Sequence, residues 1–150
     1  MSEGISGGEL VTGRLDMSLA SDVQEVARVI DSLEEFAAAE GIPADQALRF
    51  GLALDELVTN VISYGMKDRS DGAIHLVIEH RDGALHAELA DDGPPFDPLA
   101  AETALPEGDL ETRPVGGLGL TLVKTFMDRL DYRRVDGFNR LTMEMKVKAA

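Results

Sequence analysis

Two alternating segments joined by a tight turn constrain the fold of this chain most. Residues 73–80 and 84–90 place an apolar side chain at every second position, and Arg81-Asp82-Gly83 between them is typical of a hairpin turn. A hairpin of this kind is antiparallel and has one apolar face that a second layer must cover. The inward positions are Ile74, Leu76 and Ile78, then Leu85, Ala87 and Leu89.

Segments with helical spacing can supply that second layer. A first helix is expected from Ser21, which forms a capping box with Gln24, to Gly41, which is a typical C-terminal stop. A second helix is expected over residues 44–64, and a third over residues 116–130, entered through glycines.

The remaining segments complete an α+β pattern. We expect an edge strand over residues 10–19 and a final hairpin of residues 132–135 and 141–147. Because consecutive strands mostly join through tight turns, the sheet should be mixed and mostly antiparallel, with about three helices on one face. The predicted fold is a two-layer α+β sandwich and not a Rossmann fold. We expect residues 1–9 to be a flexible tail and residues 10–148 a single domain.

Composition excludes several functional classes. The chain has 14 Lys and Arg against 28 Asp and Glu, a net charge of −14, which argues against direct binding of nucleic acid or of an anionic membrane. It has no cysteine, so disulfides and thiolate nucleophiles are excluded. The sequence shows neither a signal peptide nor a membrane-spanning run, so we expect a cytoplasmic protein. Seven cations follow residue 123, and they indicate either solvated faces or a dimer or partner contact.

The second predicted helix carries a pair of polar residues. Glu56 and Asn60 are four residues apart, so their side chains project side by side. A carboxylate can accept a proton, and an amide oxygen can ligate Mg²⁺. Taken alone, the pair fits a solvated polar stripe on an amphipathic helix better than a chemical site.

Two further motifs follow. Asp91-Asp92-Gly93 ends a predicted strand, where a carboxylate can accept a hydrogen bond from an exocyclic amine and glycine admits a planar ring. Residues 116–120, Gly-Gly-Leu-Gly-Leu, begin the third helix, where exposed N–H groups attract an anion. An acidic turn and a flexible hinge are the alternative interpretations.

In this order the three motifs resemble the N, G1 and G2 boxes of the GHKL ATPases. The chain is most similar to the anti-sigma-factor serine/threonine kinases of the SpoIIAB and RsbW type, over about residues 10–148. The resemblance rests on residues 54–60, 91–98, 116–123 and 132–142. It implies the Bergerat fold, with ATP and Mg²⁺ as cofactors.

The resemblance also implies residue roles. Glu56 corresponds to the general base and Asn60 to the Mg²⁺ ligand. Asp91 corresponds to the acceptor of the adenine amine, with Gly93 beside the ring, and Thr142 to a hydroxyl that assists through water.

The phosphate side of the implied site lies in the third motif and in the segment before it. The implied contacts are Gly117, Leu118, Gly119 and Leu120. Residues 97–115 correspond to a lid, in which Arg113 can reach a γ-phosphate or can simply be an exposed arginine.

The implied function is partner switching. Such a kinase phosphorylates a serine on a STAS-type anti-sigma-factor antagonist and sequesters a sigma factor, often as a homodimer. Two alternatives stay open: an ATP- or ADP-dependent partner-binding regulator without kinase activity, and a trans-acting histidine-kinase catalytic domain. All three histidines lie in predicted strands, so none is a phosphoacceptor in cis. Tyr64 departs from the pattern, since many relatives carry histidine there.

Overall fold

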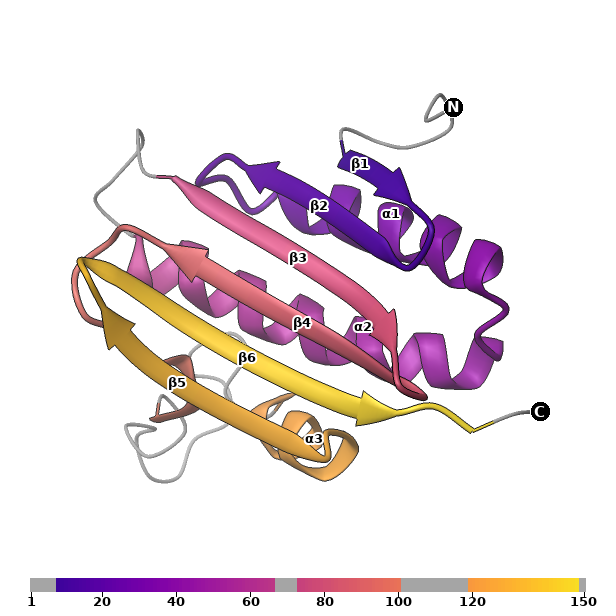
Figure 1. Cartoon of the computed structure of the whole chain (residues 1–150). Coiled ribbons are helices and arrows are strands. Elements are labelled where there is room, and N and C mark those ends of the chain that lie inside the picture. The colour runs from indigo at the N-terminus through magenta and orange to yellow at the C-terminus, as the bar shows by residue number, and fades with distance from the viewer. Residues whose placement is uncertain (1–7, 67–72, 101–118, 149–150) are drawn as a thin grey trace.

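One antiparallel sheet with helices on one face forms the frame of the protein (Figure 1). The computed structural model describes residues 8–66, 73–100 and 119–148, and within these ranges the sheet has six strands. In chain order the elements are β1 (Gly8–Val11), β2 (Arg14–Leu19), α1 (Glu25–Glu40), α2 (Ala44–Asn60), the π-helix η1 (Val61–Gly65), β3 (Ile74–Arg81), β4 (Ala84–Asp91), α3 (Gly119–Phe126), β5 (Arg129–Val135) and β6 (Phe138–Lys146).

The predicted two-layer α+β sandwich is confirmed. The strand order is β1-β2-β3-β4-β6-β5, and every pair is antiparallel. β4 pairs with β6 although α3 and β5 lie between them in the chain, so β5 becomes an edge. This pairing places the ends of β4 and β6 side by side, with Asp91 opposite Asn139.

The core lies between the sheet and the helices. Alternate residues of β3, β4 and β6 point inward, as the alternation predicts. Phe36 of α1 and Phe50 of α2 are fully buried against them. Since burying one such side chain contributes about 1.5–3 kcal/mol, this layer supplies most of the driving force for folding. The inward strand residues are Ile74, Leu76, Ile78, Leu85, Ala87, Leu89, Leu141, Met143 and Met145.

The N-terminal boundaries differ from the sequence-based expectation. The predicted single edge strand is a hairpin of β1 and β2, which turns at Gly13 with φ +77°. The first helix begins at Glu25, and no side-chain cap from Ser21 is formed. Instead the Glu25 carboxylate accepts a hydrogen bond from the Ala20 N–H at 2.7 Å. The backbone N–H just before the helix is thus satisfied by a side chain of the first helical turn.

The third helix is shorter than expected. It ends at Phe126, and Arg129 already begins β5, where the expectation was helix up to Leu130. The Asp128 N–H donates to the Glu144 carbonyl at 2.8 Å, which ties this corner to β6. Leu130 packs against the core as a strand residue, a position that helical spacing also allows.

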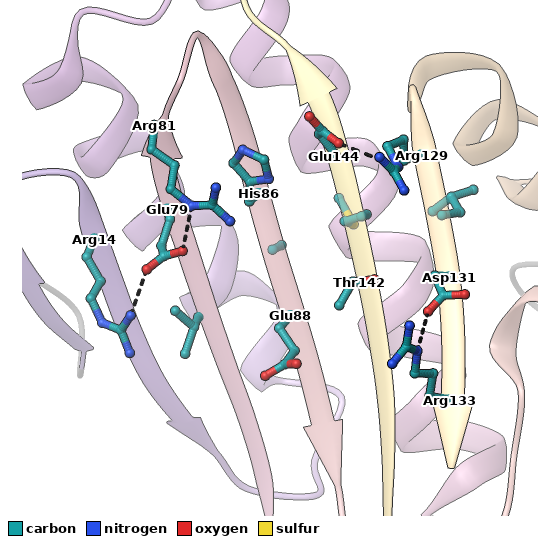
Figure 2. Close-up of a pocket in the computed structure, with 14 residues that line it drawn as sticks. Arg14, Glu79, Arg81, His86, Glu88, Arg129, Asp131, Arg133, Thr142 and Glu144 are labelled. Carbon is teal, nitrogen blue, oxygen red and sulfur yellow. Dashed lines mark hydrogen bonds and ion pairs between the residues drawn. The ribbon is translucent and has the colours of Figure 1, made fainter. Parts of the chain in front are cut away.

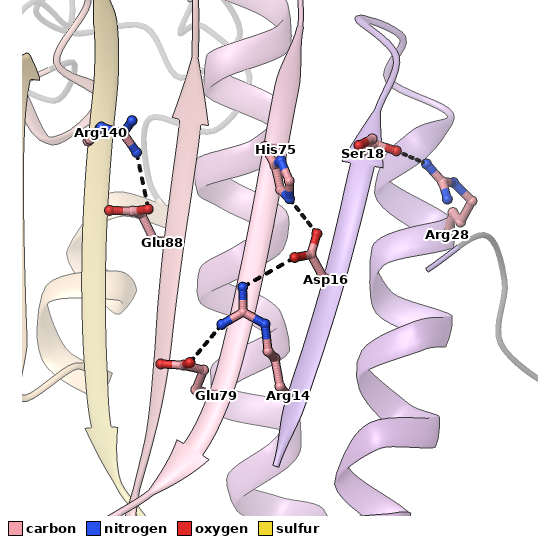
Figure 3. A network of polar contacts seen from close by, with 8 residues as sticks. All are labelled: Arg14, Asp16, Ser18, Arg28, His75, Glu79, Glu88 and Arg140. Atoms are coloured by element: carbon pink, nitrogen blue, oxygen red, sulfur yellow. Dashed lines mark hydrogen bonds and ion pairs between the residues drawn. The ribbon is translucent and has the colours of Figure 1, made fainter. Parts of the chain in front are cut away.

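The other face of the sheet is polar. Arg14 donates to Glu79 at 2.8 Å and to Asp16 at 3.3 Å, and His75 also bonds to Asp16 (Figure 3). Beside them lies a charged hollow of about 610 Å³, lined by β2 to β6 and including Thr142 (Figure 2). Because these ion pairs are exposed, this face is the solvent side of the sheet. Exposed ion pairs contribute little to stability. In the described ranges no helix has the length and apolarity needed to cross a membrane.

Gly41 provides a test of the helix-stop prediction. It adopts φ +72° after α1 and donates its N–H to the Ala37 and Ala38 carbonyls. A Cβ there would meet no atom within 4 Å, so Gly41→Ala changes backbone preference alone. We expect this variant to lower the free energy of unfolding by about 1 kcal/mol in urea denaturation, because a left-handed conformation strains alanine. Gly41→Asn should lose less, and equal losses would contradict this account.

Candidate functional site

Helix α2 brings Glu56 and Asn60 together as predicted. Asn60 Nδ2 donates to Glu56 Oε2 at 3.2 Å, and the Asn60 residue is only 1% exposed. With Nδ2 engaged by the carboxylate, the amide oxygen Oδ1 is the atom that can serve a hard cation. The Asn60 amide is therefore buried with the Glu56 carboxylate half-buried beside it, so the pair is not a fully solvated stripe.

The surroundings of Glu56 change its acidity. Partial burial raises the pKa of the Glu56 carboxyl above its usual value; the hydrogen bond from Asn60 opposes the increase, and the negative charge of Asp55 adds to it. A carboxylate with a raised pKa is a stronger proton acceptor, which is the property that a general base needs.

The start of α3 lies against the same carboxylate. A Cβ on Gly119 would overlap the Glu56 carboxylate, so a larger residue at this close approach would displace that side chain. Leu120, the next residue, is fully buried and fixes the first turn of α3 in the core. The N-terminus of α3, the positive end of its dipole, therefore adjoins the Glu56–Asn60 pair.

The end of β4 forms the second half of the site. Asp91 is 2% exposed, and its Oδ1 accepts from the Gly93 N–H and from Asn139 Nδ2, each at 2.9 Å. Among the described residues these are the hydrogen bonds to the Asp91 side chain, so Oδ2 is available to accept from a ligand. A Cβ on Gly93 would lie 2.6 Å from Met66 Sδ and 3.1 Å from the Gly65 carbonyl oxygen, so a larger residue would force neighbouring atoms of this turn to shift.

A π-helical turn joins the two halves. The sequence predicts an α-helix up to Tyr64, but the α-helix ends at Asn60 and η1 continues it to Gly65. The widened turn places Gly65 against Phe96, where a Cβ on Gly65 would lie 2.9 Å from the ring. Single π turns inside helices recur at functional sites, and here the turn connects Asn60 directly to the Asp91 turn.

Asn139 is a site residue to which neither the motifs nor the resemblance assigns a role, although it lies within residues 132–142. Its Nδ2 donates to Asp91 Oδ1 and to the Pro94 carbonyl, each at 2.9 Å. Its Oδ1 accepts from the Phe96 N–H at 3.1 Å and from the Tyr132 hydroxyl at 2.6 Å. All four hydrogen-bonding positions of the amide are thus used inside the protein. The sequence signal was a polar residue at an inward position of β6, in alternation with buried apolar residues.

Arg134 supports the same turn from β5. Its Nη1 donates to the Gly93 carbonyl at 2.6 Å. Asn139 of β6 and its register partner Arg134 of β5 together hold the backbone of residues 93–96 at three separate points.

Thr142 does not join this site, and its assignment is corrected. It alternates with the buried Leu141 and Met143, so its side chain lies on the polar face of the sheet (Figure 2). Asp91 points to the opposite, helix-covered side, where Asn139 is its neighbour on β6.

Three of the predicted phosphate-side residues lie outside the described residues: Arg113, Gly117 and Leu118. Residues 101–115 of the expected lid also lie outside them.

Comparisons with known proteins agree with this geometry. The family model of the histidine kinase-like ATPase domain matches residues 19–145. The serine/threonine-protein kinase BtrW of Bordetella bronchiseptica is 36% identical over 98 residues, which cover 64% of this chain and 69% of BtrW. The serine-protein kinase RsbW of Listeria innocua is 30% identical over 104 residues, covering 65% of this chain and 64% of RsbW.

A further relative and one solved structure extend the comparison. An anti-sigma F factor of Clostridium botulinum is 37% identical over 83 residues, and the match spans 52% of this chain and 54% of that protein. The crystal structure of the RsbU and RsbW domains of a Mycobacterium tuberculosis protein superimposes with a TM-score of 0.64 at 18% identity, over 89% of this chain and 32% of that one. At this identity the likeness concerns the fold.

Replacing Asn139 tests the hydrogen-bond network. Asn139→Leu keeps the volume but leaves the Tyr132 hydroxyl and the Phe96 N–H without their partner. We expect it to lower the free energy of unfolding by at least about 2 kcal/mol, and Tyr132→Phe by about 1 kcal/mol. Urea denaturation measures both losses. Thr142→Ala, on the polar face, should stay within about 0.5 kcal/mol of wild type. An Asn139→Leu variant as stable as wild type would refute the network.

Glu56→Gln tests the raised pKa. Above the pKa of the folded state, the wild type carries a partly buried charge that destabilises it; below the usual Glu value of 4.5, the carboxyl is protonated in both states. The neutral variant should therefore be more stable at pH 7, by less than about 1 kcal/mol because solvent screens the group. The gain should vanish as the pH falls to 4.5, in thermal unfolding measured across pH. A gain that does not depend on pH would contradict this cause, and Glu34→Gln on the exposed side of α1 is the control.

Proposed function

This chain belongs to the histidine kinase-like ATPase domain family, and from that premise we propose that it is a protein serine/threonine kinase of the anti-sigma-factor type. The observation that carries the proposal is the Glu56–Asn60 pair held against the start of α3. The relatives named serine/threonine-protein kinase BtrW, serine-protein kinase RsbW and anti-sigma F factor support it.

The second half of the site suits the base of ATP. Asp91 Oδ2 would accept a hydrogen bond from the exocyclic amine of adenine, while Asn139 fixes the carboxylate through Oδ1. Gly93 leaves room for the ring beside the backbone. The phosphates would meet the N–H groups at the start of α3, Gly119 and Leu120, where the helix dipole favours anions. Gly117, Leu118 and Arg113 keep their phosphate-side roles as predictions.

The residues also fit Mg²⁺. Asn60 is buried, its Nδ2 is engaged by Glu56, and its Oδ1 is the hard oxygen that this ion prefers. Bound there, Mg²⁺ would neutralise phosphate charge during transfer.

Glu56 has the position and the acidity of the general base. The oxygen of a partner's serine hydroxyl attacks the γ-phosphorus, its proton moves to the Glu56 carboxylate, and the bond from phosphorus to the bridging oxygen breaks. The products are phosphoserine and ADP. Because phosphoryl transfer depends mainly on positioning, the fixed orientation of Glu56 by Asn60 is as important as its pKa.

The proposed partners follow from the relatives and from the resemblance. The substrate is a serine on a STAS-type anti-sigma-factor antagonist, and the second partner is a sigma factor, bound by a homodimer of this chain. Phosphorylation releases the antagonist and frees the kinase to sequester the sigma factor. These partners act in the cytoplasm, where we place the protein.

Two variants separate binding from transfer. Glu56→Ala should bind a fluorescent ATP analogue with Mg²⁺ nearly as wild type does, while phosphorylation of a purified STAS protein falls by about 10²–10⁴-fold, since the base is lost. Asp91→Asn should weaken nucleotide binding by at least about tenfold, because a buried acceptor is replaced by a donor. Thr142→Ala is the matched control for both assays.

The alternatives give different results in the same assays. Nucleotide-dependent capture of the STAS protein without phosphoserine, unchanged in Glu56→Ala, would establish a regulator without kinase activity. Transfer to a histidine-bearing partner would establish the histidine-kinase alternative. Near-normal serine transfer by Glu56→Ala would overturn the role of Glu56.

A further inference from the structure

The helix layer has an apolar groove that the proposed kinase chemistry does not use. It lies between α1 and α2, holds about 420 Å³, and ends at Asp55. Alanines from both helices are among the residues that line it, and a Cβ on Gly51 would lie 3.4 Å from Leu33 Cδ2. The absence of a side chain at Gly51 leaves this part of the groove open between the helices.

Two leucines beside the groove are exposed. Leu48 is 62% exposed and Leu52 is 44% exposed, although both belong to the face of α2 that lines the groove. They are four residues apart, so they lie one above the other along the helix. Contiguous exposed apolar surface on a folded protein is typical of an interaction site.

The rim of the groove is acidic. Glu34 on α1 and Asp55 on α2 line it, and no Lys or Arg does so among the residues described there. Residues 25–60 contain eight carboxylates against Arg28 and Arg49, and each arginine is ion-paired within its own helix, with Glu25 at 2.9 Å and Asp45 at 3.1 Å respectively. The carboxylates are Glu25, Asp31, Glu34, Glu35, Glu40, Asp45, Asp55 and Glu56.

We propose that this groove binds an amphipathic helix of a partner protein that carries apolar residues on one face and Lys or Arg at its edges. Apolar side chains of the helix would enter the groove between Leu48 and the α1 side, and its cations would pair with Glu34 and Asp55. A groove between two helices suits the helix-in-groove mode of recognition. A second copy of this chain is disfavoured on this face, because two acidic helix pairs would repel each other.

The position of the groove gives this docking a consequence. Asp55 lines its end and is the neighbour of Glu56 in the chain, and the Thr59 hydroxyl donates to Asp55 at 3.3 Å. A partner helix that contacts Asp55 in the groove would therefore lie one residue along α2 from Glu56. The docking itself requires neither nucleotide nor phosphoryl transfer, so it stands apart from the proposed kinase activity.

Fluorescence anisotropy with a synthetic peptide tests the proposal on the full chain without nucleotide. The probe is a labelled helix with leucines at i, i+3, i+4 and i+7 and lysines elsewhere; a second peptide carries glutamate in place of lysine. We expect micromolar binding of the lysine peptide and at least about tenfold weaker binding of the glutamate peptide. The double variant Leu48→Ser/Leu52→Ser should weaken the lysine peptide by about tenfold. Leu122→Ser, on α3 and 48% exposed in the wild type, is the matched control and should bind as wild type does.

Two outcomes would overturn the proposal. Equal binding of the lysine peptide by the double variant and by wild type would show attraction by charge alone. Concentration-dependent dimers in sedimentation that disperse in the double variant would show that a second copy occupies the groove. Urea denaturation and binding of a fluorescent ATP analogue verify that the double variant is folded, and they keep a failure here distinct from a failure of the kinase proposal.

Discussion

The pairing of β4 with β6 is the contact on which both the fold and the site depend. It joins residues 84–91 to residues 138–146 and makes the C-terminal hairpin part of one continuous sheet. The same register sets Asp91 opposite Asn139, so a buried carboxylate and a buried amide satisfy each other at the end of the two strands. A slip of β6 by one residue would turn Asn139 and the inward apolar residues of β6 to the solvent face, and would disrupt the site together with the core.

The helix layer completes the site through one irregular turn. If α2 remained α-helical past Asn60, the following residues would rotate, and the contact of Gly65 with Phe96 and of Met66 with the Gly93 turn would change. The π turn thus links the acid–amide pair of α2 with the buried carboxylate of β4. Glycines at positions 93 and 119 permit the two close approaches that hold these elements together.

The sequence predicts those features of the fold that depend on neighbouring residues better than contacts between residues far apart in the chain. The hairpin of β3 and β4, and the end of α1 at Gly41, follow from neighbouring residues and were predicted correctly. The end of α3 was predicted wrongly, because Leu130 fits the apolar spacing of a helix as well as that of a strand. Resemblance placed Thr142 at the adenine side, yet its alternation with Leu141 and Met143 already turned it outward. Local alternation marks Asn139 as an inward residue, but it does not indicate the partner Asp91, which lies 48 residues away in the chain.

The Asn139 amide uses all of its hydrogen-bonding positions within the protein, and this affects which part of the site can distinguish ATP from ADP. Every hydrogen bond it makes is formed within the protein, so the turn that follows Asp91 is ordered at folding and its conformational entropy is lost before any ligand binds. A preorganised pocket of this kind holds the base of ATP and of ADP equally well. For a nucleotide bound as we propose, the energy difference between the two must therefore arise on the phosphate side, which includes Glu56, Asn60 and the first turn of α3.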